Sequence, residues 1–582
     1  MASRINVTKN KKGYDVIQFT FPYSPEIVQK IKDTFASCEW SKTFKSWSIP
    51  AFVENYPKLK AILPEPLIVD DYFQNWYTSK LIENETQQAT YKELIAKISN
   101  YTFKTKPYEH QKKGFIFCVK NQSGAIFVDC GLGKTFIMLN YIQFLLQNNV
   151  ISKILIIMPL SVIYTWRNEI PKHTDIKESD YEILVKYPIE TRKKMLNESR
   201  KKIYLLNYDC VADMQNEIVN KNFDMIVCDE SSAVKNIKAG RTKAMLEIID
   251  GIGKIKTGDK VEHKKMGKSI KHRFVLTGTP VSQKVTDVYS QVKIVAPNEF
   301  KESFWAFRNR YCRLGGFKGY EIVGLQNIDE LEKRIAKCAI VFKKDDCLDL
   351  PEKSYQTKSI ELSTEQKKHY KELVENLVTM MGQSKVEATI VIAQMTKLSQ
   401  ITSGFMVDTE SKTIRLKDNA KLKVLQETLD ELSGKTIIWV RFREDVKIIS
   451  ETLTPNTFVT FTGETSQKDR ETALTSFKDN PIVNILIMTS AGGYGLNLAH
   501  ASNLIYYSHE FSVEKRQQSE DRCHRIGTTG TVTIISLVGT DTIDEYVVEC
   551  CQQKRDVAEG ILNNINKIIN PWIKKDLTNT KI

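Results

Sequence analysis

Short, almost wholly apolar runs alternate with longer segments of helical period in two stretches of the chain. The first stretch has strand candidates at residues 125–128, 153–158, 202–206, 224–228 and 273–276. The second has them at residues 435–440, 457–461, 484–488, 503–507 and 531–537. Buried strands that alternate with helices predict parallel sheets covered on both faces. The pattern therefore predicts an α/β fold with two tandem parallel-sheet lobes.

Different patterns flank these lobes. Residues 14–21 alternate like a strand, 25–35 have the period of an amphipathic helix, and 40–49 read as a returning strand, which predicts a small α+β domain. Residues 370–377 keep helical spacing. We expect this domain at 1–65, a helical connector at 66–105, the first lobe at 106–299, helical protrusions and a linker at 300–418, the second lobe at 419–540, and a C-terminal helical brace at 541–582.

Length and composition limit the class of protein. At 582 residues the chain is too long for one core. It has no apolar run near the roughly 18 residues that a membrane span needs, and its N-terminus lacks the apolar core of a secretory signal. Eleven cysteines without a Cys-x-x-Cys pair argue against a zinc site and a disulfide framework. We expect a protein of a reducing compartment, cytoplasmic or nucleoid-associated, with no membrane partner.

The charge balance points to a polyanionic partner. The chain has 84 Lys and Arg against 70 Asp and Glu, a formal net charge of +14. Such a surplus favours nucleic acid as the partner, although an unspecialised basic surface gives the same number. Residues 254–273 are rich in lysine and poor in apolar residues. We expect a flexible loop there, either in contact with DNA or merely solvated.

A phosphate-binding loop follows the first strand candidate. The sequence Asp-Cys-Gly-Leu-Gly-Lys-Thr at 129–135 lies between this strand and a long apolar helix. Gly131 and Gly133 would let backbone N–H groups approach a phosphate at the helix N-terminus. Lys134 would reach the β- and γ-phosphates of ATP, and the Thr135 hydroxyl would ligate Mg²⁺. The alternative is an ordinary tight turn between strand and helix.

Two further features fit a nucleotide site. Gln111 lies upstream of the loop, where its amide can bind the adenine edge; without a nucleotide it would be a surface glutamine. Asp229 and Glu230 end another buried strand. Adjacent carboxylates in such a place are costly without a metal or a cation. We expect Asp229 to hold Mg²⁺ and Glu230 to polarise the attacking water.

The motifs occur in the order of a known family. The phosphate loop, Met-Pro-Leu-Ser at 158–161 with Trp166, Asp-Glu-Ser-Ser at 229–232 and Leu-Thr-Gly-Thr-Pro at 276–280 resemble the Swi/Snf branch of superfamily 2 ATPases. The segment 518–527, Gln-Ser-Glu-Asp-Arg-Cys-His-Arg-Ile-Gly, continues the resemblance. The resemblance implies two RecA-like lobes that close on ATP and Mg²⁺.

The resemblance also assigns roles beyond the phosphate loop. It implies that Arg522 and Arg525 stabilise charge on the γ-phosphate, and we expect them to share one helical face because they are three residues apart. The resemblance places Gln518 and Gly495 with these arginines, in the half of the ATP site that the second lobe provides. The resemblance further implies DNA contacts, for which the candidates are Ser161, Lys235, Asn236 and Thr279.

The N-terminal domain resembles the HARP module of annealing helicases, which binds branched DNA. The resemblance covers residues 23–28 and 45–50, and it makes Lys45 and Trp47 candidates for DNA contact. Aromatic rings among basic groups suit base stacking. The alternative is that Trp40 and Trp47 form the core of a small domain, with surface lysines in contact with the DNA.

The chain departs from the family pattern at several positions. Val128 stands where the fuller loop pattern has glycine, and Ser232 where the family has histidine. In the family, that histidine links the acid pair to the Thr-Gly-Thr loop. Its replacement by Ser232 therefore puts in doubt the coupling between these two motifs, and not ATP hydrolysis itself. Gln283 replaces an asparagine, Thr528 a glutamine, and residues 511–513 the common Trp-Asn-Pro.

The combined expectation is an ATP-dependent translocase on double-stranded DNA. It would act as a monomer on duplex or forked DNA without sequence specificity, and remodel or anneal branched DNA in replication or repair. A virus or an AT-rich microbe would suit the residue usage. The alternatives are a strand-separating DNA or RNA helicase, and a nucleic-acid-binding scaffold with weak ATPase activity.

Overall fold

The computed structural model describes residues 2–10, 13–35, 38–258, 260–281, 284–315, 321–348, 350–383, 388–408, 410–490, 496–525, 527–528, 530–553 and 572. The chain divides into two compact units. The first comprises residues 1–129 and 133–342, and the second comprises residues 130–132 and 343–582. No helix among the described residues has the length and apolar character that a membrane crossing requires.

The N-terminal domain is a sheet with two helices. Its strands are β1 (Ser3–Lys9), β2 (Asp15–Thr20), β3 (Glu39–Ser41), β4 (Ser46–Pro50) and β5 (Leu67–Val69), in the order β3-β4-β2-β1-β5. Helices α1 (Pro25–Thr34) and α2 (Asn55–Lys60) contribute Ile31 and Leu59 to a core with Ile5 and Phe19. Residues 40–49, expected as one strand, form a hairpin, because the turn around Lys45 separates β3 from β4.

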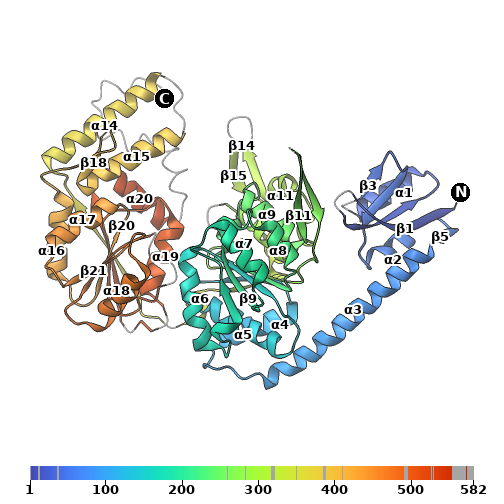
Figure 1. Ribbon diagram of the computed structural model, residues 1–582. Coiled ribbons are helices and arrows are strands. Elements are labelled where there is room, and N and C mark those ends of the chain that lie inside the picture. Colours follow the sequence, from blue (N-terminus) through green and yellow to red (C-terminus); the bar gives the residue numbers. More distant parts are fainter. Residues whose placement is uncertain are drawn as a thin grey trace. The chain divides into compact units, whose positions relative to one another are not determined.

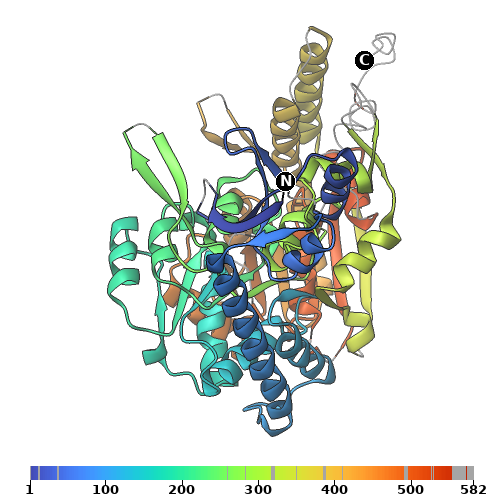
Figure 2. The same cartoon turned by 90° about the vertical axis from the view of Figure 1, so that its right-hand side faces the viewer.

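A single long helix, α3 (Asp71–Lys97), follows this domain (Figures 1 and 2). The carboxylate of Asp70 caps its N-terminus by accepting a hydrogen bond from the Phe73 N–H at 2.6 Å. The other end is joined to the first lobe, where the Tyr91 hydroxyl lies 3.1 Å from Nε2 of the buried His272.

The first lobe contains a parallel sheet. Its strands, in spatial order, are β16 (Ala339–Phe342), β6 (Gly124–Val128), β13 (His272–Thr277), β10 (Met225–Asp229), β7 (Ile154–Met158), β9 (Ile203–Asn207) and β8 (Tyr181–Ile183). Its helices are α4 (Glu109–Asn121), α5 (Lys134–Gln147), α6 (Leu160–His173), α7 (Ile189–Glu198), α8 (Gln215–Asn220), α9 (Gly240–Ile249) and α10 (Asp287–Val295).

Both faces of this sheet are buried. Phe127, Ile157 and Cys228 project into a core cluster that also contains Met245 of α9 and Val292 of α10. Side chains that alternate with these project to the opposite face of the strands, and they are also fully buried: Ile126, Ile156 and Val227. Burial on both faces explains the continuous apolar runs in the sequence, and the predicted parallel sheet is confirmed.

The basic stretch 254–273, expected as a flexible loop, belongs largely to a β-hairpin, so that prediction is wrong. Strands β11 (Ile252–Thr257) and β12 (Lys260–Lys265) pair in an antiparallel register. Asn216 of α8 holds the base of the hairpin, since its side chain donates to the Lys254 carbonyl at 2.8 Å and accepts from the Lys254 N–H at 2.7 Å. The hydroxyl of Tyr14 in the N-terminal domain donates to Asp250, next to this base, at 3.3 Å.

The segment after α10 contains α11 (Phe304–Tyr311), β14 (Cys312–Gly315), β15 (Glu321–Leu325), α12 (Ile328–Ala336) and α13 (Lys344–Cys347). A pair of helices, α14 (Thr364–Gln383) and α15 (Ala388–Ser403), is prominent in the second unit (Figure 1), and the hairpin β18 (Phe405–Val407) with β19 (Thr413–Arg415) follows it. Residues 300–418 were expected to be helical, but they also contain β16 and a further strand, β17 (Lys353–Ile360), which extend the two parallel sheets.

The second lobe repeats the parallel architecture. Its strands, in spatial order, are β17, β24 (Val532–Gly539), β23 (Asn503–Tyr506), β20 (Thr436–Val440), β22 (Ile485–Thr489) and β21 (Phe458–Phe461). Its helices are α16 (Ala420–Glu431), α17 (Arg443–Thr452), α18 (Gln467–Asp479), α19 (Val513–Cys523) and α20 (Ile543–Gln552). Two parallel-sheet lobes therefore confirm the predicted α/β fold class.

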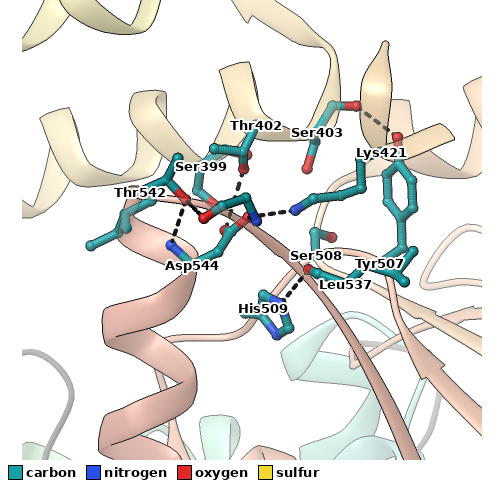
Figure 3. Close-up of polar contacts among 12 residues, drawn as sticks. Ser399, Thr402, Ser403, Lys421, Tyr507, Ser508, His509, Leu537, Thr542 and Asp544 are labelled. Atoms are coloured by element: carbon teal, nitrogen blue, oxygen red, sulfur yellow. Dashed lines mark hydrogen bonds and ion pairs between the residues drawn. The ribbon is translucent and has the colours of Figure 1, made fainter. Parts of the chain in front are cut away.

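A buried ion pair ties three helices of the second lobe together (Figure 3). Lys421 at the start of α16 and Asp544 in α20 lie 2.6 Å apart, and their side chains are 0% and 1% exposed. The hydroxyl of Thr402 in α15 donates to the second oxygen of Asp544 at 3.3 Å. Charges this deep in the lobe are tolerated because each has its partner.

We predict that Lys421→Met strongly destabilises the second lobe, because it leaves Asp544 buried without its cation. The loss should be about 3–5 kcal/mol. Lys423 on the same helix pairs with Asp418 at 2.6 Å, but these side chains are 67% and 51% exposed, so Lys423→Met should cost less than about 1 kcal/mol. Hydrogen exchange at the amides of β20 and β24 measures both losses. Equal protection in the two variants would contradict the prediction.

Candidate active site

The loops with the predicted chemistry lie at the carboxyl edge of the first-lobe sheet. Strand β13 lies between β6 and β10, with Thr277 opposite Phe127 and Leu276 opposite Asp229. The chain leaves these three strands at the same edge, where ligands bind in parallel sheets. The sheet order thus brings together three loops that are far apart in the sequence.

The loop after β6 needs glycine at two positions. Gly131 and Gly133 have φ angles of +89° and +84°, in the left-handed region that side chains other than glycine rarely adopt. A β-carbon on Gly133 would lie 2.3 Å from the Gln111 Nε2 atom, so Gln111 packs directly on the loop. The Oε1 atom of Gln111 accepts a hydrogen bond from the Tyr108 N–H at 3.0 Å, at the start of α4.

Lys134 and Thr135 begin helix α5 directly after this loop. The Lys134 side chain is largely buried and folds back over the loop, where its Nζ donates to the Val128 carbonyl at 2.9 Å. Val128 itself is a sheet residue opposite Phe342, and its φ angle is not positive. A glycine is therefore not needed at Val128, and the departure from the fuller pattern leaves the loop geometry intact.

Asp229 ends β10, and the residue is 3% exposed. Its Oδ2 accepts from the Trp166 indole N–H at 2.7 Å, and its Oδ1 accepts from the Glu230 N–H at 2.9 Å. Burial raises the pKa of Asp229, while the Trp166 hydrogen bond and the charge of Lys134 act to lower it.

Glu230 follows in an unusual backbone conformation. Its φ angle of +49° lies in the left-handed region, where a side chain is disfavoured. Such backbone strain persists only when the surroundings hold it, and it is concentrated at functional sites. The next residues form the 3-10 turn η4 (Ser231–Val234).

The candidates for DNA contact in this lobe lie on two loops and a helix. Thr279 follows β13, and its N–H donates to the Thr277 hydroxyl at 3.1 Å. Lys235 and Asn236 follow η4, with Lys235 Nζ 3.8 Å from a carboxylate oxygen of Asp287. Ser161 lies in α6, and its side chain, like all of Gln283, is outside the described residues.

The second unit carries Gln518 and Arg522 in helix α19. Both side chains are largely buried, and the Arg522 guanidinium lies 5.0 Å from the centroid of the Trp439 ring. Helix α19 ends at Cys523, so the expectation that Arg522 and Arg525 share one helical face is wrong. Arg525 lies in the following turn, where its Nη1 donates to the Leu496 carbonyl at 3.1 Å. Gly495 is outside the described residues.

The N-terminal candidates lie in the β3–β4 hairpin. Lys45 is exposed in its turn with a φ angle of +46°. Trp47 is partly buried against the domain core, and its ring centroid is 5.4 Å from that of Trp40, which is about half exposed. The Trp47 ring therefore contributes to the core of the small domain, as the alternative interpretation held. Lys45 is the more solvent-accessible of the two candidates for DNA contact.

One partner of this site was missed by sequence reasoning. The Trp166 side chain, fully buried in α6, binds the Asp229 carboxylate, although Trp166 was noted only as part of a motif. An aromatic residue on the apolar face of a helix gives no local signal that its N–H is directed at a carboxylate 63 residues away.

Comparison with protein families gives two matches. The model of the SNF2-related domain matches residues 108–407, and that of the helicase conserved C-terminal domain matches residues 420–527. The first match covers half of the chain and contains the phosphate loop and the acid pair. The second contains Gln518, Arg522 and Arg525.

Similar proteins come from bacteria, animals and a phage. An uncharacterized ATP-dependent helicase of Mycoplasma genitalium is 26% identical over 76% of this chain and 40% of its own length. The human DNA annealing helicase and endonuclease ZRANB3 is 24% identical over 78% of this chain and 40% of its own length. Protein p41 of Acyrthosiphon pisum secondary endosymbiont phage 1 is 23% identical over 80% of this chain and 99% of its own length. The chain thus spans about two fifths of the first two relatives.

Among solved structures, the SWI2/SNF2 ATPase core of Sulfolobus solfataricus in complex with dsDNA is similar to this chain. The TM-score is 0.38 at 23% sequence identity, and the match covers 83% of this chain and 99% of the other.

We predict that Trp166→Phe weakens the binding of Mg²⁺ with nucleotide by about ten-fold near neutral pH. The indole N–H favours the ionised form of Asp229, so its loss raises the pKa of this carboxylate further. The acidic limit of binding should therefore move to higher pH. Titration of a fluorescent ATP analogue with Mg²⁺ between pH 5 and 8 measures the shift.

Trp305→Phe is the matched control, because Trp305 belongs to the same unit and is 51% exposed. It should leave the pH dependence unchanged. An unchanged acidic limit in Trp166→Phe would show that Asp229 does not depend on the indole.

Proposed function

Because the chain belongs to the SNF2-related family of helicase-like ATPases, we propose that it is a DNA-stimulated ATPase that moves along duplex DNA. The observation that carries the proposal is the convergence of Lys134, Asp229 and the two glycines of the loop at one sheet edge. A buried lysine and a buried aspartate that interact beside a glycine loop form a cradle for the phosphates of ATP.

Within this proposal each first-lobe residue has a chemical task. The backbone N–H groups at Gly131 and Gly133 bind phosphate oxygens, and Lys134 neutralises charge on the β- and γ-phosphates. Glu230 orients and polarises the attacking water. We also assign Gln111, which packs on the loop, to the binding of the adenine edge.

The donor set of this site suits Mg²⁺. Thr135 and Asp229 offer hard oxygen ligands, which Mg²⁺ prefers. Among the described residues no group of three or more His, Cys, Asp or Glu side chains is arranged to hold a metal ion. Such a sparse set fits a cation that keeps several waters and takes its other ligands from phosphates. When bound, Mg²⁺ would supply positive charge to the phosphate oxygens.

The second unit supplies the remaining groups. We assign Arg522 and Arg525 to the stabilisation of negative charge on the transferred phosphate, with Gln518 and Gly495 in the same half of the site. These residues are nearly 400 positions from Lys134 in the sequence. Their role therefore requires that the two lobes close during turnover, which would link hydrolysis to movement along DNA.

The finer proposal is action on branched or forked DNA, in replication or repair. The chain resembles an annealing helicase over 78% of its length, and its N-terminal hairpin exposes Lys45 beside the Trp40–Trp47 pair. Contacts of Ser161, Lys235, Asn236 and Thr279 with the phosphate backbone would give affinity without sequence specificity. We place the protein in the cytoplasm or on the nucleoid as a monomer; a phage protein among its relatives fits a viral source.

We predict that the protein hydrolyses ATP slowly by itself and at least ten-fold faster with duplex or forked DNA at low salt. Lys134→Ala should abolish both rates without loss of DNA binding, because it removes only the phosphate contact. Lys172→Ala is the matched control, since this lysine lies on α6 and is 60% exposed. Phosphate release measures all rates. Hydrolysis that DNA does not stimulate would contradict the proposal, and little or no phosphate release under any condition would support the scaffold alternative.

The N-terminal hairpin is tested separately. Lys45→Glu should weaken binding and stimulation on forked DNA more than on plain duplex, while Lys32→Glu on α1 should affect both substrates alike. Competition binding with matched forked and linear oligonucleotides gives the ratio. Equal loss on both substrates argues against fork recognition by this hairpin, and displacement of a labelled strand would favour a strand-separating helicase.

A further inference from the structure

One buried glutamine connects the acid-pair loop to the Thr-Gly-Thr loop. Gln291 lies in α10 and has an exposed fraction of 0%, as does Ser231, the residue after Glu230. The Ser231 hydroxyl donates to Gln291 Oε1 at 2.6 Å. The Gln291 Nε2 donates to the Pro280 carbonyl at 2.8 Å. The side chain therefore spans the loops that follow β10 and β13.

The orientation of this amide is set by its partners. Nε2 also donates to the Asp287 carbonyl at 2.8 Å, one turn earlier in α10. Both carbonyl oxygens, of Pro280 and of Asp287, can only accept, so the NH₂ end must point toward them. The oxygen end then faces the Ser231 hydroxyl. Both hydrogens and the acceptor of the amide are thus used, and a rotated amide would turn its oxygen toward two carbonyl oxygens and lose these hydrogen bonds.

The neighbouring residue holds the other end of the same turn. The Ser290 hydroxyl is 2.7 Å from the Val234 carbonyl and 2.8 Å from the Lys235 carbonyl. Successive residues of α10 thus bind both ends of η4, the turn that follows Glu230. A displacement of α10 or of the loop at Pro280 would be transmitted to the strained Glu230 backbone through buried hydrogen bonds.

This connection matters because Ser232 stands where the family has a histidine. The family histidine that Ser232 replaces is the residue expected to link the acid pair to the Thr-Gly-Thr loop. The described contacts supply a link one residue earlier, from Ser231 through Gln291 to Pro280. The chain therefore retains a route between these loops, by different side chains.

We propose that Gln291 is a positioning residue that couples DNA contact at the Thr-Gly-Thr loop to the placement of Glu230. The proposal rests on the proposed DNA-stimulated ATPase. Gln291 touches neither nucleotide nor DNA in this scheme. It acts through Ser231 on one side and Pro280 on the other, so its loss should reduce the stimulation by DNA rather than nucleotide affinity.

The test compares variants that cut the link at different points. Gln291→Met keeps the length and bulk of the side chain and removes all its hydrogen bonds. Ser231→Ala removes a single hydroxyl and leaves the bonds of Gln291 to Pro280 and Asp287 in place. The control is Gln215→Met, because Gln215 is another buried glutamine of this lobe, bonded to Glu247 and the Ile252 carbonyl away from the site.

The readouts are the thermal midpoint, the KM for ATP with Mg²⁺, and kcat with and without duplex DNA. We expect Gln291→Met and Ser231→Ala to keep KM within about two-fold and to lose about ten-fold of the DNA stimulation, equivalent to roughly 1.4 kcal/mol. The double variant should lose no more than Gln291→Met, since both changes cut one link. Gln215→Met should leave the stimulation ratio unchanged.

The outcomes separate this proposal from the proposed function. A wild-type protein without DNA stimulation overturns both. Normal stimulation in the wild type with an unchanged ratio in Ser231→Ala and Gln291→Met overturns the coupling role alone. An equal fall of both rates in these variants and in Gln215→Met would show that buried glutamines act in folding only. If Gln291→Met fails to fold, the smaller change Ser231→Ala decides the question.

Discussion

The burial of charge at the end of β10 is the constraint on which the first lobe depends. Asp229 is almost inaccessible to water, and an isolated carboxylate there would be costly. The indole of Trp166, the N–H of Glu230 and the charge of Lys134 offset that cost. These partners come from α6, the acid loop and α5, so one carboxylate requires three elements to meet at one edge.

Buried polar groups that have their hydrogen-bond or ion-pair partners occur elsewhere in the chain as well. Lys421 and Asp544 hold three helices of the second lobe together, while Gln291 joins two loops of the first with every hydrogen-bonding group used. Buried polar groups with complete sets of partners specify a unique packing, because any shift leaves a donor or acceptor unmet. A loop held this way moves with its neighbours, which is what the proposed coupling of ATP hydrolysis to DNA requires.

The sequence predicts the parts of this structure whose signal is local. Strands such as β7 and β10 are buried on both faces, so they appear as continuous apolar runs. The phosphate loop is recognisable because its glycines, lysine and threonine are adjacent. By contrast, β17 has a mostly exposed, polar face and gave no such run, and the polar hairpin of β11 and β12 resembles a loop. The end of α19 before Arg525 depends on a turn fixed by Thr528 and Leu496.

The roles of Trp166 and Gln291 lie beyond local signals, because each depends on a partner brought close by the sheet order. We propose that the carboxyl edge of the first-lobe sheet binds ATP together with a cation for which Thr135 and Asp229 would be ligands. The most direct measurement is a crystal structure with Mn²⁺ and a non-hydrolysable ATP analogue, with anomalous scattering used to locate the metal. We expect an anomalous peak adjoining the Thr135 hydroxyl and on the Asp229 side of the loop. A nucleotide bound elsewhere, or a peak remote from both residues, would contradict it.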